Sequence, residues 1–153
     1  MWELNRVSES EFKSQSKFPL IIVLDNIRSL NNIGSFFRTS DAFNVEKIYL
    51  CGITAPPPHR EIHKTALGAT ETIEWEHVDS TIDLTRKLKQ DGVIVCSIEQ
   101  AEKTTLLNEV AQLPIDHKYA LVFGNEVDGV DQAVIDLSDM IIEIPQFGTK
   151  HSL

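Results

Sequence analysis

Three short clusters of the sequence carry residues that could do chemistry, and the first is residues 31–38, NNIGSFFR. Its arginine, Arg38, could fork onto a phosphate, and Gly34, one helical turn earlier, leaves room for a bulky partner. Either Asn31 or Asn32 could cap a helix, because an asparagine oxygen accepts a hydrogen bond from an unpaired backbone N–H. The alternative for Arg38 is a surface salt bridge with one of two nearby carboxylates, Asp41 or Glu46.

The second cluster is residues 123–129, FGNEVDG, in which two glycines bracket the carboxylate of Glu126. Glycines permit positive φ and leave backbone N–H and C=O groups free to meet a flat ligand. The cluster is not a phosphate loop, which needs a Gly-Lys-Ser/Thr ending, and it lacks the G-x-G-x-x-G spacing of dinucleotide sites. The structural alternative is a tight strand-to-helix turn, with Glu126 or Asp128 near the start of a helix.

The third cluster is residues 144–153, IPQFGTKHSL, a Pro/Gly loop with a polar tip. The neighbouring His151 and Ser152 do not predict a hydrolase, because adjacent side chains rarely face each other and no G-x-S-x-G motif is present. His59 and His63 have helical spacing but lack further ligands, so we expect no metal site.

Composition limits the class of protein. The 153 residues, 42% of them hydrophobic, fit a single domain over residues 1–153, with residues 1–19 as a short polar lead-in. The sequence has no apolar run long enough for a membrane span, and its polar start is no signal peptide. Cys51 and Cys96 lie in apolar runs, so we expect buried, reduced thiols and a cytoplasmic protein.

The net charge of −9 argues against nucleic-acid binding over the whole surface, though not against a local basic patch. Positive groups do gather in two places. One group, after a proline run, consists of His59, Arg60, His63 and Lys64. The other, at the polar tip of the third cluster, consists of Lys150 and His151. Solvated surface charge is the simpler explanation of both groups.

The elements that must position these clusters follow from short apolar runs rich in Ile, Val and Leu, typical of strands buried on both faces. We predict strands at residues 20–25, 47–51, 93–98, 119–123 and 140–144, with a further short strand near 72–77. Helical patterns alternate with them at residues 32–43, 60–67, 81–89 and 131–137. On the first helix, Ile33, Phe36, Phe37 and Phe43 form the core stripe. The alternation predicts an α/β fold, an open and mostly parallel sheet with helices on both faces.

Ligands of such sheets bind beyond the carboxyl ends of the strands, so the residues that follow each strand matter most. Polar residues and glycines gather in four places: Asn26, Arg28, Asn31, Asn32 and Gly34 after the first strand, Glu99 and Gln100 after residues 93–98, Gly124, Asn125, Glu126 and Gly129 after residues 119–123, and the loop after residues 140–144. The three clusters are therefore expected at one edge of the sheet.

Together the clusters resemble the three motifs of the SpoU/TrmH family, S-adenosyl-L-methionine-dependent RNA 2′-O-ribose methyltransferases of the SPOUT superfamily. Motif 1 is similar to Asn32-x-Gly34-x-x-x-Arg38, and motif 2 to Phe123-Gly124-Asn125-Glu126-x-x-Gly129. Motif 3 is similar to Ile144-Pro145-x-x-Gly148-x-x-x-Ser152-Leu153, and residues 64–69 also resemble a family segment. Each motif is weak alone, but all three occur in order, each after a predicted strand.

The resemblance implies a deep trefoil knot at the carboxyl end and a homodimer with active sites at the subunit interface. It also implies that S-adenosyl-L-methionine lies bent in the knot, held mainly by backbone groups of the loops after the late strands. Transferred to this sequence, the cofactor residues are Ile98, Glu99, Val122, Gly124, Asn125, Ile144, Gly148, Ser152 and Leu153.

The resemblance further implies roles in catalysis. Arg38 would orient the ribose 2′-hydroxyl with the help of an RNA phosphate; its role as a base stays open, since a guanidinium has a pKa above about 12. Asn32 would fix the local loop, Glu126 would support the knot and dimer site, and Ser152 would contact substrate or cofactor. The RNA, a transfer or a ribosomal RNA, would meet Arg38 and the basic residues His59, Arg60, Lys64 and Lys150.

The sequence departs from the family pattern at its end. Family motif 3 continues past Ser-Leu with an asparagine and a helix that threads the knot, so we expect the native protein to continue past residue 153. Two alternatives to the enzyme are a non-catalytic dimer of the same fold that binds RNA or cofactor, and an unrelated nucleotide-binding enzyme such as a dehydrogenase. The missing glycine fingerprint argues against the dehydrogenase.

Overall fold

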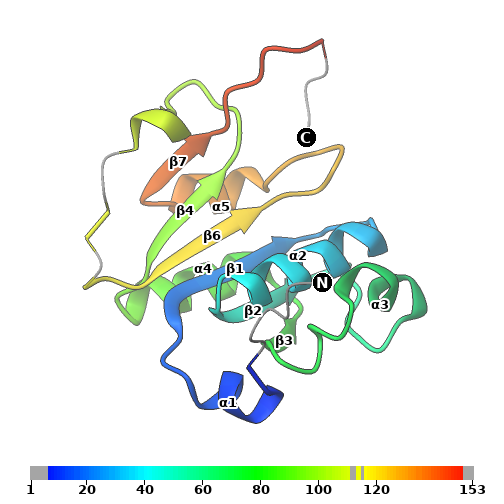
Figure 1. The fold of residues 1–153 in the computed structure, drawn as a ribbon. Coiled ribbons are helices and arrows are strands. Elements are labelled where there is room, and N and C mark those ends of the chain that lie inside the picture. Colours follow the sequence, from blue (N-terminus) through cyan, green and yellow to red (C-terminus); the bar gives the residue numbers. More distant parts are fainter. Residues whose placement is uncertain (1–6, 111–112, 115, 150–153) are drawn as a thin grey trace.

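In a computed structural model, which describes residues 7–110, 113–114 and 116–149, the chain forms one parallel sheet with helices on both faces (Figure 1). The strands have the order β3-β2-β1-β6-β4-β7-β5, and every neighbouring pair is parallel. Their bounds are β1 Phe18–Asp25, β2 Val45–Cys51, β3 Glu74–Val78, β4 Ile94–Ile98, β5 Thr105–Leu106, β6 Tyr119–Phe123 and β7 Met140–Glu143. The predicted fold class is therefore confirmed.

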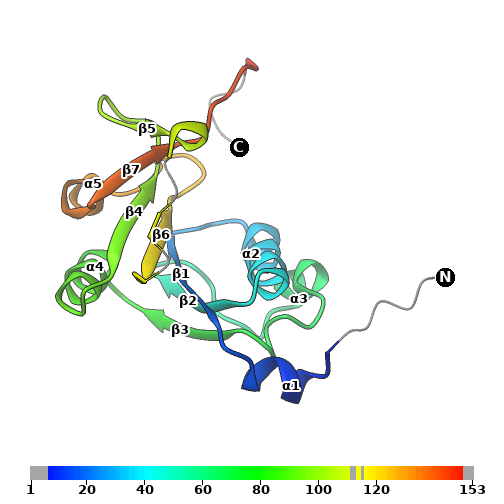
Figure 2. The same cartoon turned by 60° about the vertical axis from the view of Figure 1, so that its left-hand side comes forward.

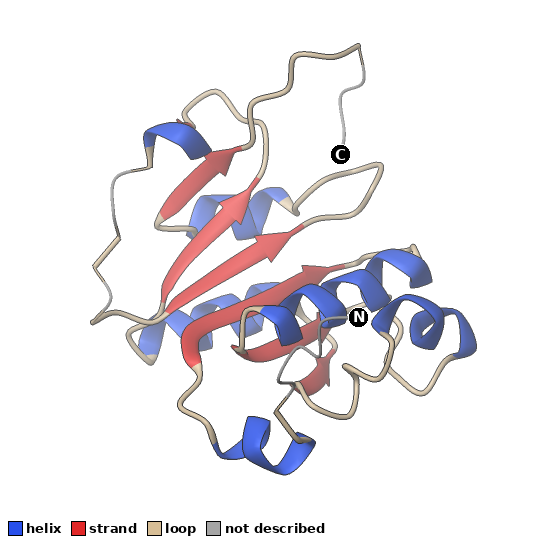
Figure 3. Ribbon diagram, viewed as in Figure 1, coloured by secondary structure: helices blue, strands red, loops and turns tan. Residues whose placement is uncertain are grey.

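The helices are α1 Glu9–Ser14, α2 Leu30–Ala42, α3 Arg60–Ala66, α4 Thr81–Gln90 and α5 Gln132–Leu137, with a 3₁₀ turn at Leu107–Glu109. Helices α2 and α3 cover one face of the sheet, while α4 and α5 cover the other (Figures 2 and 3). In the part of the chain that the structure describes, no helix is both long and apolar enough to cross a membrane.

Strand β1 is buried on both faces, which explains its unbroken apolar run. Ile22 and Leu24 pack with the core residues of α2 and α3, whereas Ile21 and Val23 pack with those of α4 and α5. The predicted strand near residues 72–77 is present as β3. Strand β5 was not predicted, because two residues are too few to carry a periodic pattern.

Strand β6 lies between β1 and β4 and brings the ends of these three strands to one level. Phe123, the last residue of β6, is in register with Leu24 of β1 and with Ile98 of β4. The loops that follow these strands therefore start side by side at the carboxyl edge of the sheet. Strands β2 and β3 lie on one side of β1 and strands β4 to β7 on its other side, so the direction of the chain across the sheet switches beside β1, which is where open α/β sheets bind ligands.

Two details of α2 differ from the sequence prediction. Neither asparagine caps the helix; the cap is Ser29, whose Oγ accepts the N–H of Asn32 at 3.2 Å. Phe43 was predicted in the core stripe but is 71% exposed, because α2 ends at Ala42 and residue 43 has left the helical conformation. Ile33 and Phe37 are fully buried, as expected.

Gly34 is the contact point of α2 and α3, so the partner that approaches this glycine is the chain's own next helix. A Cβ on Gly34 would lie 2.0 Å from Thr65 Oγ1 and 2.3 Å from the carbonyl oxygen of Ile62. The Thr65 hydroxyl also donates to the carbonyl of Asn31 at 2.9 Å, which fixes α3 beside the start of α2.

We expect the substitution Gly34→Ala to lower the free energy of unfolding by about 1–2 kcal/mol, because the overlap with the α3 backbone outweighs the gain in helix propensity. Urea denaturation followed by circular dichroism measures the change. The control Ser35→Ala, on the exposed side of the same turn, should stay within about 0.5 kcal/mol of the wild type. Equal stability of Gly34→Ala and the wild type would show that α2 and α3 are not in this close contact.

Candidate functional site

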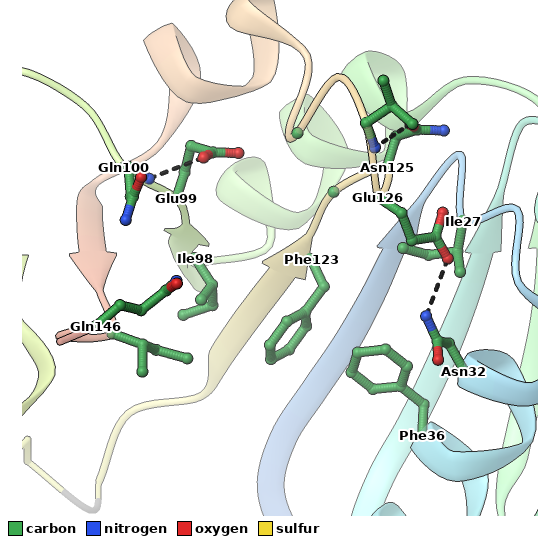
Figure 4. Close-up of a pocket in the computed structure, with 14 residues that line it drawn as sticks. Ile27, Asn32, Phe36, Ile98, Glu99, Gln100, Phe123, Asn125, Glu126 and Gln146 are labelled. Carbon is green, nitrogen blue, oxygen red and sulfur yellow. Dashed lines mark hydrogen bonds between the residues drawn. The ribbon is translucent and has the colours of Figure 1, made fainter. Parts of the chain in front are cut away.

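A cavity of about 420 Å³ opens at the carboxyl edge of the sheet (Figure 4). Its walls come from the start of α2 and from the segments that follow β1, β4, β6 and β7, which are far apart in the sequence. The lining residues are Ile27, Asn32, Phe36, Ile98, Glu99, Gln100, Phe123, Gly124, Asn125, Glu126, Val127, Gly129, Ile144 and Gln146.

The carboxylate of Glu126 holds the loop after β6 against the start of α2. It accepts the backbone N–H groups of Arg28 at 2.9 Å and Ser29 at 3.0 Å, and the side-chain amide of Asn32 at 3.1 Å. Figure 4 shows Glu126 and Asn32 pointing toward each other. Partial burial by itself raises the pKa of Glu126, but these donors outweigh it, so the pKa lies below its usual value.

The loop after β6 is a tight turn closed by its own backbone. Asn125 and Gly129 exchange two N–H···O bonds of 2.9 Å, and Gly129 has a φ of 72°. A Cβ on Gly124 would lie 2.1 Å from the carbonyl carbon of Gly129, so the strand end and the turn need glycine at this contact. The side chain of Asn125 fills the turn, since its Oδ1 accepts the N–H of Val127 at 2.9 Å.

The structure differs from the alternative considered from the sequence, in which Glu126 or Asp128 would lie near the start of the helix that follows. Glu126 and Asp128 do not lie at the start of the next helix, because α5 begins at Gln132 and is capped by Asp131, whose Oδ1 accepts the N–H of Ala133 at 2.8 Å. Glu126 instead serves the start of α2, a helix nearly a hundred residues earlier in the chain.

A second carboxylate, that of Glu99, joins the end of β4 to the same turn. Its oxygens accept the N–H groups of Gln100 and Val130, each at 2.8 Å. A Cβ on Gly129 would lie 2.2 Å from Glu99 Oε2, so this glycine also permits the contact. Both carboxylates of the cavity are therefore engaged by donors of the protein, which lowers their tendency to repel an electron-rich ligand.

The rest of the cavity is largely apolar. The rings of Phe36 and Phe123 lie 4.8 Å apart between centroids at 58°, and Figure 4 shows them facing each other between α2 and β6. Ile98 and Ile144 add further apolar wall. Apolar walls with a few fixed polar groups are typical of sites for small organic ligands and cofactors.

Seven of the twelve residues predicted for catalysis or cofactor binding meet at this cavity: Asn32, Ile98, Glu99, Gly124, Asn125, Glu126 and Ile144 line it. Val122 does not, because it is fully buried in the core one residue before the end of β6. Gly148 is exposed in the loop after β7 and does not line the cavity. Lys150, Ser152 and Leu153 lie outside the described residues, so their predicted roles are untested.

Arg38 is exposed on α2, six residues after Asn32, and is not among the lining residues. The salt bridge considered for it is not formed within the described residues, since both candidate carboxylates have other partners. Asp41 accepts the Thr72 hydroxyl at 2.6 Å, and Glu46 pairs with Lys118 at 2.5 Å. The predicted RNA-binding residues His59, Arg60 and Lys64 are exposed on or beside α3, and Lys64 pairs with Glu61 at 2.7 Å.

Sequence reasoning missed several lining residues. Phe36 was assigned to the core, yet it is only half-buried and faces the cavity; the helical wheel cannot separate these roles because both lie on the apolar side. Phe123 begins motif 2 and ends a predicted strand but was not assigned to the cofactor, and Ile27, Val127 and Gln146 are not fixed positions of any motif. Their positions just after strand ends are the signal that could have found them.

The two cysteines are free and buried, as predicted, and burial raises the pKa of Cys51 to about 12 and that of Cys96 to about 11. Such thiols are unreactive at neutral pH. Across the described ranges, no group of three or more His, Cys, Asp or Glu residues is placed to hold a metal ion.

A family model for the SpoU rRNA methylase family matches residues 19–153. Among curated proteins, the chain is 30% identical over 145 residues to the 23S rRNA (guanosine-2′-O-)-methyltransferase RlmB of Neisseria meningitidis, covering 95% of this chain and 56% of that protein. It is 26% identical over 141 residues to a putative TrmH family tRNA/rRNA methyltransferase of Staphylococcus haemolyticus, covering 92% of this chain and 55% of that protein. The chain thus spans little more than half the length of these curated relatives.

Solved structures show the same fold. The TrmH/SpoU tRNA modifying enzyme of A. aeolicus superposes with a TM-score of 0.80 at 24% identity, over 95% of this chain and 72% of that one. An AdoMet-bound rRNA methyltransferase from Sinorhizobium meliloti superposes with a TM-score of 0.81 at 24% identity, over 93% of this chain and 54% of that one.

We expect Glu126→Gln to lower the free energy of unfolding by about 1–2 kcal/mol at pH 7, because an amide cannot accept from all three donors. The folded pKa of Glu126 is depressed, so its stabilisation is complete above the unfolded pKa of about 4.3 and is lost as pH falls through the folded pKa. Denaturation at a series of pH values should show the two proteins converging below about pH 4.

The matched control is Asp128→Asn, two residues away in the same turn and exposed. It should stay within about 0.5 kcal/mol of the wild type at each pH. A Glu126→Gln deficit that did not change with pH, or one that Asp128→Asn reproduced, would contradict the role of the Glu126 carboxylate.

Proposed function

Since the chain belongs to the SpoU rRNA methylase family, we propose that it transfers the methyl group of S-adenosyl-L-methionine to a ribose 2′-hydroxyl in a ribosomal or transfer RNA. The observation that carries the proposal is the meeting of motif residues Asn32 and Glu126 with the loops after β4, β6 and β7 around one cavity. The named activities of the curated relatives support the reaction type. An RNA substrate and the buried, reduced thiols fit a cytoplasmic location.

The cofactor would occupy the cavity. Its volume of about 420 Å³ lies within the range of small-molecule sites, and its apolar wall suits the adenine ring. Ile98 and Ile144 would flank that ring, while the backbone of Gly124, which also lines the cavity, would bond its edge. Because Glu99 and Glu126 already accept two and three hydrogen bonds, their oxygens are not left facing the ring unpaired. The bound cofactor supplies an electrophilic methyl group.

The remaining work of the protein is to align the 2′-hydroxyl with that methyl group and to assist the loss of its proton. The resemblance to motif 1 implies that Arg38 takes part in this alignment and proton loss. Arg38 makes no ion pair within the described residues. We assign Arg38 a positioning role toward the ribose and its phosphate, because a guanidinium is a poor base.

The position of Arg38 supports a homodimer. Along α2 it lies about 9 Å beyond Asn32, so it does not reach into the cavity of its own chain. A second chain, packed so that its α2 crosses this edge, would bring its Arg38 to the cavity. The predicted trefoil knot involves the segment after β7 and stays a prediction, since residues 150–153 lie outside the described residues.

The RNA would approach along the outer faces of α2 and α3. Arg38 lies one turn beyond the contact of these helices at Gly34, and His59, Arg60 and His63 are exposed on or beside α3. In a chain with a net charge of −9, such a local patch would contact few phosphates, so RNA binding should weaken with added salt along a shallow slope of about 0.7–0.9 per phosphate contacted.

Purified protein with labelled S-adenosyl-L-methionine and total RNA should form 2′-O-methylated RNA, and Arg38→Ala should lower kcat about 100-fold or more with unchanged affinity for the cofactor. The control Arg86→Ala, on α4 of the opposite face, should keep full activity. Mapping methylated riboses in RNA from cells with and without the gene would identify the site. Binding of RNA or cofactor without any methyl transfer would favour the non-catalytic alternative.

Mixing two inactive variants tests whether Arg38 serves the partner's cavity. Arg38→Ala keeps an intact cavity, and Ile144→Asp keeps Arg38 but places a carboxylate in the cavity wall. After subunit exchange, half of the dimers are mixed and each has one complete site, so the mixture should recover about a quarter of wild-type activity. No recovery, with mixed dimers verified by mass, would place Arg38 and the cavity of the same chain in one site.

A further inference from the structure

Arg28, at the edge of the cavity, has no role in the motifs described above. We propose that Arg28 binds a backbone phosphate of the substrate RNA beside the ribose that receives the methyl group. The inference rests on the proposed function and adds to it a substrate-positioning residue in the same site.

The backbone of Arg28 is fixed at the cavity although its side chain is exposed. Ile27, which precedes it, lines the cavity, and Ser29, which follows it, caps α2. The N–H of Arg28 donates to Glu126 Oε2 at 2.9 Å, so the same carboxylate that shapes the cavity sets the position of this residue. The guanidinium thus projects into solvent from a rigid base, which limits the entropy lost when it binds a ligand.

Two carboxylates close to Arg28, one in the fold and one in the sequence, are occupied by other donors. Glu126 accepts two backbone N–H groups and the Asn32 amide. Asp25, three residues before Arg28, is buried and accepts the Thr81 hydroxyl and the N–H of Asp131. Arg28 forms no ion pair with any residue that the structure describes, in contrast to five other cations: Lys47, Lys64, Arg86, Lys89 and Lys118.

A positive charge at position 28 does not stabilise helix α2, so the stability of the fold does not explain why the residue is an arginine. Arg28 lies just before the cap of α2, where the positive end of the helix dipole disfavours a positive charge. The charge of Arg28 therefore adds to the positive electrostatic potential of the helix start, which attracts an approaching anion. A phosphate of the RNA matches the fork of the guanidinium and would be held by paired N–H donors.

Arg28 and Arg38 should act differently because they lie at opposite ends of α2. Arg38 is about 12 Å along the helix from Leu30, whereas Arg28 adjoins the cavity of its own chain. Loss of Arg28 should therefore weaken binding of RNA with little change in the chemical step. The carboxylate of the cofactor is the competing anion, and the experiment must separate it from the phosphate.

The test compares wild type, Arg28→Ala, Arg28→Lys and the control Arg86→Ala. For Arg28→Ala we expect KM for RNA to rise about tenfold, and the slope of log K against log salt to fall by about 0.7–0.9, the contribution of one phosphate. Arg28→Lys should restore the slope, because the charge is kept. The cofactor Kd, measured by calorimetry, and kcat should stay within about twofold of the wild type.

An unchanged salt slope and KM for Arg28→Ala, in a preparation whose wild type methylates RNA, would overturn the inference alone. A weakened cofactor Kd with an unchanged RNA slope would overturn it in favour of the cofactor carboxylate. If the wild type binds RNA without methylating it, the proposed function fails, and the comparison of slopes still decides the role of Arg28.

Discussion

The site depends on one interaction, the carboxylate of Glu126 against the start of α2. It accepts the backbone N–H groups of Arg28 and Ser29, the two residues that precede α2, and it orients the Asn32 amide, so a residue after β6 fixes the start of a helix that follows β1. The Asn125 amide repeats this connection by donating to the carbonyl of Asn26 at 2.8 Å. Without these bonds, the two sides of the cavity would be held by the pairing of β1 with β6 and by the contact between the Phe36 and Phe123 rings.

The same interactions explain how an acidic chain could present the proposed site for RNA and a flat cofactor. Glu99, Glu126 and Asp25 all lie near the carboxyl edge of the sheet, yet backbone N–H groups, a hydroxyl or an amide engage each one. Their charges stabilise turns and helix starts and are partly compensated there. The other residues that line the cavity are apolar, amide or glycine, so the chemistry of its walls differs from the net charge of −9.

The sheet and the location of the site could be predicted because they depend on features repeated along the sequence. Long runs of Ile, Val and Leu require burial on both faces, and polar residues after such runs must meet at one edge. The details depended on competition between similar groups. Ser29 rather than Asn31 or Asn32 caps α2, and Phe36 faces the cavity while Phe37 is buried in the core. A difference of one to three positions in the sequence decides each case. Contacts across the fold, such as Gly34 with α3, leave no local signal.

The division of roles between the two ends of α2 follows from these constraints. The amino end is fixed by Glu126 and Thr65 and belongs to the cavity, so the residues there can hold a ligand in a constant geometry. Arg38 lies beyond the contact with α3, on the exposed side, where its charge is free of the neighbouring carboxylates. The rigid amino end of α2 contributes to the cavity of its own chain, and the exposed Arg38 lies further along the helix. This arrangement suits the proposed homodimer, in which the Arg38 of one chain would serve the cavity of the other.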